Sequence, residues 1–152
     1  MSDKILDSKV VLQVAILVKD IKTTAAKYAE LFGVDVPEIC ISAGYDKALT
    51  EYKGKHCDVT CKMAFIYLDN LTIEIIEPDG KESIWTDMLN ENGEGFHHMA
   101  FGVKGMKEAI CTFEKTGMPL IQKGEYQGGR YAFIDSVKDY KMVFELLEND
   151  NK

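Results

Sequence analysis

The sequence predicts an α+β fold in which two βαβββ modules form a curved, barrel-like mixed sheet with the helices outside. Three observations predict it: an order of strand, helix and strands that occurs twice, apolar alternation typical of half-buried strands, and a length that suits one small domain. The 152 residues are 46% hydrophobic and 28% charged, the balance of an ordinary globular domain. We therefore expect one domain over residues 1–152, with modules at 11–78 and 96–149 and a linker helix within 79–95.

Each module is expected to begin with a short apolar strand and a helix. Residues 13–19 (Gln-Val-Ala-Ile-Leu-Val-Lys) align with residues 98–104 (His-Met-Ala-Phe-Gly-Val-Lys). A polar turn follows in both copies, and then apolar residues recur three and four positions apart. The first helical pattern ends at Gly33 and the second at Gly117, where glycine is the typical residue just past a helix end.

Further strands complete each module. The expected strands are residues 62–68 and 71–77 in the first copy, joined by an Asp69-Asn70 hairpin turn, and residues 130–135 and 142–148 in the second. The last strands resemble each other, Ile-Glu-Ile-Ile-Glu against Phe-Glu-Leu-Leu-Glu. Between the copies, Ser83 is the expected N-cap of a short helix that ends near Asn92. Two such modules side by side predict a pseudo-twofold site at their junction.

Strand alternation predicts which side chains face the concave side of the sheet. The bulky apolar set of each strand should pack on a helix, which leaves four repeat-related polar residues facing inward: Gln13, Glu74, His98 and Glu145. Two buried carboxylates without partners would each cost several kcal/mol, and a divalent cation removes that cost. One imidazole, one amide oxygen and two carboxylates suit an octahedral site for Ni, Co, Mn, Zn or Fe.

Substrate contacts are expected from Arg130, Tyr126 and Lys62. Arg130 alternates with Ala132 and Ile134, so it should face the cleft mouth if Phe133 packs outward. There it could hold a carboxylate or phosphate, although a solvated surface arginine explains the pattern equally well.

The remaining histidines and the closely spaced cysteines are not expected to bind a metal. His97 should point to the face opposite His98 and be structural, and His56 has no assigned role. Cys57 and Cys61 are four residues apart, but no second cluster completes a zinc site. We expect both thiols to lie on one face of a strand instead.

Charge and composition limit the partners. The formal net charge is −7, so the overall field does not attract a polyanion and nucleic acid is an unexpected partner. The sequence contains neither an apolar run long enough to cross a bilayer nor a signal peptide, so we expect a cytoplasmic protein that does not bind a membrane. Unpaired sheet edges in so small a chain favour a homodimer.

Several short motifs occur between residues 11 and 148: Leu31-Phe32-Gly33, the stretches at 73–78 and 144–148, and Gly-Glu-Gly-Phe-His-His at 93–98. Together they resemble the vicinal oxygen chelate superfamily, which includes glyoxalase I, methylmalonyl-CoA epimerase, extradiol dioxygenases and bleomycin-resistance proteins. The Gly-Glu-Gly-Phe-His-His stretch looks most like the methylmalonyl-CoA epimerase branch.

The resemblance implies a site and a reaction. The family's four metal positions fall on Gln13, Glu74, His98 and Glu145, although the family usually has His where this chain has Gln13. The implied activity is that of a metal-dependent isomerase, epimerase or lyase that removes a proton from a carbon next to a carbonyl. Glu145 would be the base, with Glu74 as a partner base or permanent ligand. The alternative is a metal-free protein that binds or sequesters a small molecule, as bleomycin-resistance proteins do.

Overall fold

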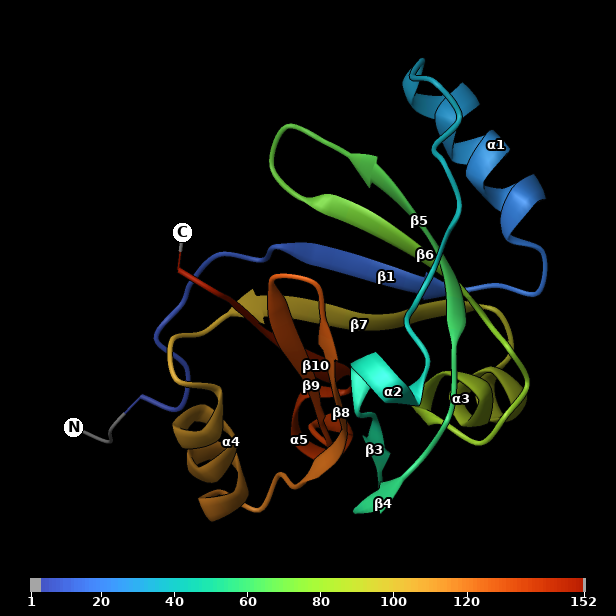
Figure 1. The fold of residues 1–152 in the computed structure, drawn as a ribbon. Coiled ribbons are helices and arrows are strands. Elements are labelled where there is room, and N and C mark those ends of the chain that lie inside the picture. The colour runs from blue at the N-terminus through green and yellow to red at the C-terminus, as the bar shows by residue number, and fades with distance from the viewer. Residues whose placement is uncertain (1–3, 152) are drawn as a thin grey trace.

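The structure, a computed structural model, describes residues 4–151, which form one ten-stranded mixed sheet and five helices (Figure 1). The strands are β1 (Gln13–Leu17), β2 (Cys40–Ile41), β3 (Glu51–Tyr52), β4 (Lys55–His56), β5 (Cys61–Tyr67), β6 (Thr72–Pro78), β7 (Gly95–Gly102), β8 (Leu120–Tyr126), β9 (Gly129–Ile134) and β10 (Val143–Asn149). The helices are α1 (Ile21–Phe32), α2 (Tyr45–Ala48), α3 (Ile84–Asn92), α4 (Met106–Lys115) and α5 (Val137–Tyr140). The strand order is β2-β5-β6-β1-β7-β10-β9-β8-β3-β4, which confirms the expected α+β fold.

The repeated segments meet in the middle of the sheet. There β1 pairs antiparallel with β7, and each pairs parallel with the last strand of its own half, β6 or β10. The register is symmetric, because Gln13 lies opposite Ala100 while its repeat-related residue His98 lies opposite Ala15. This symmetry supports the alignment of the two first strands.

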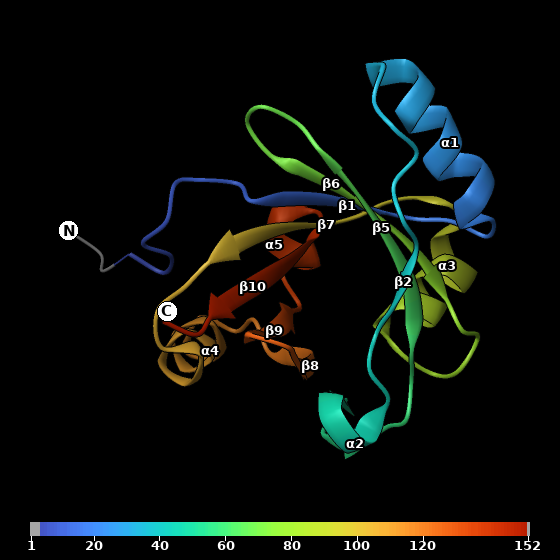
Figure 2. The same ribbon diagram turned by 45° about the horizontal axis from the view of Figure 1, so that its top comes forward.

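The sheet curls around its concave side, with α1 and α3 outside one half (Figure 2). Helix α1 packs Ile21 and Ala25 against Ile66 and Ile75 of the neighbouring strands. Helix α4 packs in the same way on β9 and β10 of the second half. Each fully buried isoleucine contributes about 1.5–3 kcal/mol, so these contacts fix each helix on its half of the sheet.

Local signals in the sequence explain where the first helices start and stop. Asp20 caps α1 through a hydrogen bond from the Thr23 N–H, and the helix stops at Gly33, whose φ of 65° favours glycine. Ser83 caps α3 by accepting a hydrogen bond from the Thr86 N–H at 3.1 Å. Both expected helices are therefore confirmed.

The segment between α1 and β5 joins the two halves. Strand β3 leaves the first half and pairs antiparallel with β8 of the second, and β4 then forms the far edge of the sheet. Helix α2 contacts β8 in the same region. A part of the first half therefore closes the concave space against the second half.

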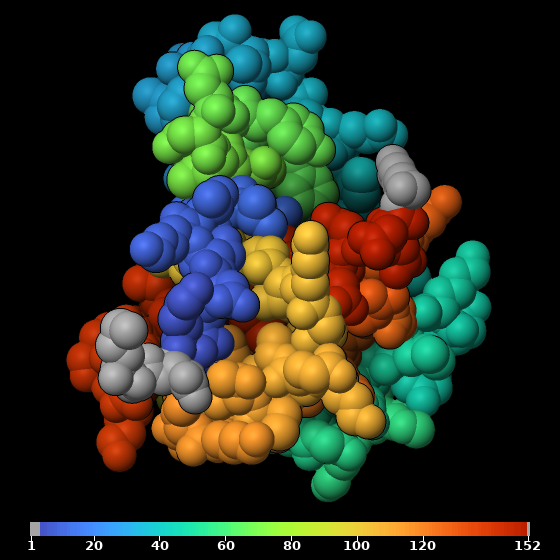
Figure 3. All heavy atoms as spheres, turned by 90° about the vertical axis from the view of Figure 1, so that its left-hand side faces the viewer, coloured from blue at the N-terminus to red at the C-terminus, as the bar shows by residue number. Residues whose placement is uncertain are grey.

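The chain before β1 lies along the outside of the second half, against α4 (Figure 3). Its residues Ile5 and Leu6 pack against the buried cluster that includes Met106 and Phe113. Within residues 4–151, no helix has the length and apolar character required to cross a membrane.

Candidate metal and substrate site

The four repeat-related polar residues come together at the centre of the sheet. Gln13 and His98 lie on the two middle strands, and Glu74 and Glu145 lie on the strands that flank them. The imidazole of His98 is fully buried, while Glu74 and Glu145 are 7% and 6% exposed. Alternation placed these residues on the concave side, and the structure brings them together there.

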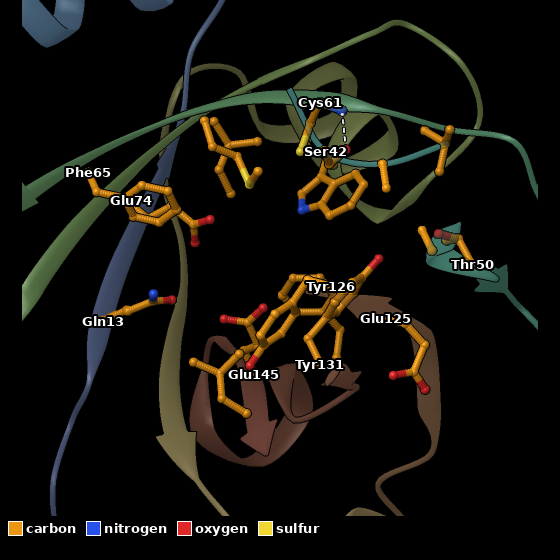
Figure 4. A pocket seen from close by; sticks show the side chains of 18 residues that line it. Gln13, Ser42, Thr50, Cys61, Phe65, Glu74, Glu125, Tyr126, Tyr131 and Glu145 are labelled. Carbon is orange, nitrogen blue, oxygen red and sulfur yellow. Dashed lines mark hydrogen bonds between the residues drawn. The ribbon is translucent and has the colours of Figure 1, made fainter. Parts of the chain in front are cut away.

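The ligand atoms of three of these residues converge. Atoms of Glu74, His98 and Glu145 all lie within 4.8 Å of one another. The Nε2 atom of His98 is 2.9 Å from Glu145 Oε2 and 3.5 Å from Glu74 Oε2. Figure 4 shows the amide of Gln13 directed toward the same region as the two carboxylates.

The residues present fit a divalent cation. His98 Nε2 and Glu145 Oε2 are both buried, and neither makes a well-aligned hydrogen bond within residues 4–151 despite their short separation. Buried polar atoms are normally satisfied, and a cation bound between these two facing atoms would satisfy both. Two carboxylates, one imidazole and one amide oxygen together neutralise a divalent ion and suit its octahedral coordination.

Burial and mutual charge set the protonation of this group. Burial alone would lower the pKa of His98, but the carboxylates of Glu145 and Glu74 raise it to about 9. Burial raises the pKa of Glu145, against the opposing effect of His98. The neighbouring His97 has a strongly lowered pKa because it is buried beside His98. The protonation of each of these side chains therefore depends on the charge of its neighbours.

A cavity of about 310 Å³ opens beside the cluster (Figure 4). Gln13, Glu74 and Glu145 lie at one end of it, and Thr50 and Glu125 lie at the other. The remaining lining residues are largely apolar or aromatic: Ser42, Ala43, Ala48, Val59, Cys61, Met63, Phe65, Ile76, Trp85, Tyr126, Tyr131, Phe133 and Leu147. The cavity can therefore hold a small, mainly apolar molecule against a polar end.

The aromatic wall was missed by sequence reasoning. Tyr131 and Phe133 of β9 line the cavity, whereas Phe133 was expected to pack outward. Trp85 of α3 packs against both, with ring centroids 6.0 and 6.1 Å away. Alternation in β9 does place Tyr131 and Phe133 on one face. The prediction assigned that face to the helix side because large apolar residues usually pack under a helix.

Of the expected substrate contacts, only Tyr126 lines the cavity. Its hydroxyl donates a hydrogen bond to Asn149 at 2.8 Å. Burial, followed by the charge of Glu145, raises its pKa to about 12, so the hydroxyl stays protonated at neutral pH.

The expected inward orientation of Arg130 is wrong, and Lys62 is also absent from the cavity lining. The two are repeat-related and each bonds a glutamate on the neighbouring strand, Lys62 to Glu77 at 3.0 Å and Arg130 to Glu148 at 2.8 Å. These glutamates in turn accept backbone N–H groups at the starts of α1 and α4. Lys62 and Arg130 thus belong to a helix-capping arrangement.

The expectation for His97 is also wrong. Its ring does not point away from His98 but touches it, and both histidines pack on Phe133. An irregularity in the pairing of β7 with β1 removes the strict alternation on which the expectation depended.

The cysteines do not join the group of convergent ligand atoms. Cys61 lines the cavity together with Val59, Met63 and Phe65. Burial raises the pKa of its thiol, which therefore stays protonated. Cys57 lies before the start of β5 and outside any strand, so the expectation that both thiols share one strand face is wrong.

Known proteins resemble this chain in sequence and fold. An ethylmalonyl-CoA/methylmalonyl-CoA epimerase of Cereibacter sphaeroides is 28% identical over 120 residues, which cover 78% of this chain and 79% of the relative. A hypothetical protein of Bacillus halodurans shares the fold with a TM-score of 0.66 at 21% identity, over 93% of this chain and 95% of that one. A methylmalonyl-CoA epimerase of Mycobacterium tuberculosis does so with a TM-score of 0.62 at 16% identity, over 96% and 94%.

The family comparison agrees with these likenesses. The profile of the Glyoxalase/Bleomycin resistance protein/Dioxygenase superfamily matches residues 12–133, a range that holds three of the four central polar residues. This chain belongs to that superfamily.

Proposed function

We propose that this protein is a metal-dependent isomerase, epimerase or lyase that removes a proton from a carbon next to a carbonyl group. Glyoxalase I and the methylmalonyl-CoA epimerases are the models for this reaction. The observation that carries the proposal is the convergence of Glu74, His98 and Glu145, of which the two glutamates line the polar end of a small cavity. The curated epimerase relative supports the same reaction type.

The proposed cofactor is a divalent ion of Ni, Co, Mn, Zn or Fe, held by Gln13, Glu74, His98 and Glu145. When bound, such an ion stabilises negative charge on the carbonyl oxygen of a substrate. His98 and the two glutamates are held by the sheet, so the chain orders these groups before any ligand arrives.

Proton transfer is assigned to Glu145, with Glu74 as its partner. Glu145 lines the polar end of the cavity, where its carboxylate can reach the carbon next to a carbonyl group held at the ion. Glu74 and Glu145 come from opposite halves of the sheet, so they can approach a substrate carbon from two sides. A proton removed by one and returned by the other would invert the configuration of that carbon.

The wall of the cavity would orient the rest of the substrate. Within the described residues, no lysine, arginine or histidine lines it, and Glu125 adds a third carboxylate. An anionic group of the substrate would therefore have to lie at the ion, with its apolar part against the aromatic side chains.

Solvent deuterium exchange tests the proposal. The metal-loaded protein should exchange the α-proton of a candidate, and thioesters and hemithioacetals are the first to try. Glu145→Gln should reduce the rate by about 100-fold or more, because it removes the base. Glu148→Gln is the matched control, since Glu148 lies on the same strand but bonds Arg130 and the start of α4. Equal exchange in wild type and Glu145→Gln would refute the base assignment.

The aromatic lining of the cavity favours a second candidate function, the binding of a small molecule without a metal. Five aromatic side chains line the cavity: Phe65, Trp85, Tyr126, Tyr131 and Phe133. Ligand binding that is unchanged by metal removal, together with an absence of exchange for every candidate, would favour this function.

A further inference from the structure

The consecutive residues His97 and His98 point to the same side of the sheet. In a regular strand, neighbouring side chains point to opposite faces. Here Ala15 of β1 pairs with His98, and the next residue, Ile16, pairs with Phe96. His97 is therefore an extra residue on β7, and such a bulge re-aims a side chain.

The bulge brings the two imidazoles into contact. The rings lie at 78° to each other with centroids 4.9 Å apart, and the two Nδ1 atoms are 2.6 Å apart. His97 is 1% exposed and His98 is fully buried. Two nitrogen atoms this close form a hydrogen bond, so one Nδ1 must carry a proton and the other must accept it.

The position of His98 decides which ring donates. Its Nε2 faces Glu145 and Glu74, so a cation held by these carboxylates would need Nε2 to be free of a proton. A neutral His98 then carries its proton on Nδ1, the atom that touches His97. His97 must accept with its own Nδ1 and carry a proton on Nε2.

We propose that His97 is a positioning residue that accepts the Nδ1–H of His98 and so directs the bare Nε2 of His98 toward a cation held by the two glutamates. Because the imidazole is rigid, a hydrogen bond at Nδ1 fixes both the tautomer and the direction of Nε2. The inference relies on the proposed function for the cation only, because the contact between the histidines is present without it.

Two substitutions of similar shape separate this role from simple packing. His97→Asn keeps an acceptor, because its side-chain oxygen occupies nearly the place of Nδ1. His97→Leu keeps the branched shape without any acceptor, which leaves the Nδ1–H of His98 unsatisfied and favours the tautomer that blocks Nε2. We expect the affinity for Zn²⁺ and Co²⁺ to fall about 10–100-fold in His97→Leu and to change less than about threefold in His97→Asn.

Nitrogen NMR of labelled protein gives a readout that needs neither activity nor metal. The chain has three histidines, so the imidazole signals can be assigned. We expect a proton on Nδ1 of His98 and a nitrogen–nitrogen coupling through the hydrogen bond to Nδ1 of His97. The coupling should be detectable in wild type and absent in His97→Leu.

The outcomes distinguish this inference from the proposed function. No coupling, or a coupling whose proton belongs to His97, would overturn it, as would equal metal affinity in wild type and His97→Leu. If His97→Leu does not fold, the coupling in wild type decides alone. A protein with the expected coupling and affinity loss but no α-proton exchange would refute the proposed function and leave the role of His97 intact.

Discussion

At the scale of single residues, Gln13 is the proposed metal ligand at the position where the family resemblance implies a histidine. An amide oxygen is a weaker ligand than imidazole for Ni²⁺, Co²⁺ and Zn²⁺. Gln13 projects from the middle of the sheet into the polar end of the cavity, on the same side as the two carboxylates. A single substitution at residue 13 should therefore change the metal affinity of the site.

We predict that Gln13→His raises the affinity for Ni²⁺ or Co²⁺ by about tenfold. Gln13→Leu, which removes the oxygen, should lower it. Competition with a chromophoric chelator measures both values on purified protein. Identical affinities for wild type, Gln13→His and Gln13→Leu would mean that Gln13 does not touch the ion.

The sequence was sufficient to locate Gln13, Glu74, His98 and Glu145 because side chains alternate regularly on the stretch of strand used for each. In β7 this regular stretch begins at His98, just after the bulge. The sequence failed for His97, since a bulge in β7 shifts one residue to the other face and leaves no mark in the local pattern. It failed for Arg130 because the β9 residues that face inward are the aromatic ones. The prediction assumed that large apolar residues pack under a helix, and this does not hold for the aromatic residues that line a cavity.

At the scale of elements, a glutamate on the last strand of each half, β6 or β10, accepts a hydrogen bond from the start of the helix of the same half, α1 or α4. The N–H of Ile21 donates to Glu77 Oε2 at 3.0 Å, and the N–H of Met106 donates to Glu148 Oε2 at 3.0 Å. A carboxylate at a helix start is favoured by the helix dipole as well. The repeated Glu-x-x-Glu pattern therefore has two uses: its first glutamate faces the site and its second fixes a helix.

We predict that Glu77→Gln lowers the free energy of unfolding by about 1 kcal/mol at pH 7. The hydrogen bond from Ile21 outweighs burial and lowers the pKa of Glu77 below its ordinary value of 4.5. The charged form thus stabilises the fold above about pH 4.5, and this contribution is lost as the pH falls through the lowered pKa.

Urea unfolding of wild type and Glu77→Gln at neutral and acidic pH measures this effect. The difference between the two proteins should shrink as the pH falls below the ordinary pKa of glutamate. Exposed Glu30, replaced by Gln, provides a control with no contact to a helix start. A difference that is constant with pH would show that the charge of Glu77 contributes nothing.

The elements between α1 and β5 were the least predictable part of the fold. Strands β3 and β4 have two residues each, and their partner is β8, far along the chain. Such short strands carry no periodicity that a sequence pattern can reveal. Strand β8 was also missed, because Gln122 and Gly124 stand at its buried positions in place of apolar side chains.

At the scale of the whole molecule, both halves of the sheet and helix α3 contribute residues to the cavity lining. Its wall includes Trp85, the chain's one tryptophan, which is 6% exposed. Intrinsic fluorescence therefore reports directly on what occupies the cavity. With three carboxylates in the lining and no basic residue among the described residues that line it, the metal-free cavity should reject anions.

We predict that metal-free protein binds cyclohexanone at least about tenfold more tightly than cyclohexanecarboxylate, and that loading with Zn²⁺ reverses this order. Fluorescence titration of Trp85 measures both affinities. In Trp85→Phe the signal should disappear, while a ligand-induced rise in melting temperature still reports binding. Tight binding of the carboxylate without metal would contradict the proposed charge distribution.

The central claim is that the junction of the two repeated halves is a site for one divalent ion. Elemental analysis after equilibration with Ni²⁺, Co²⁺, Mn²⁺ or Zn²⁺ and removal of the excess tests it most directly. We predict about one ion per chain in wild type. The folded double variant Glu74→Gln/Glu145→Gln should retain almost none. A wild-type metal content no higher than that of the double variant would contradict the claim.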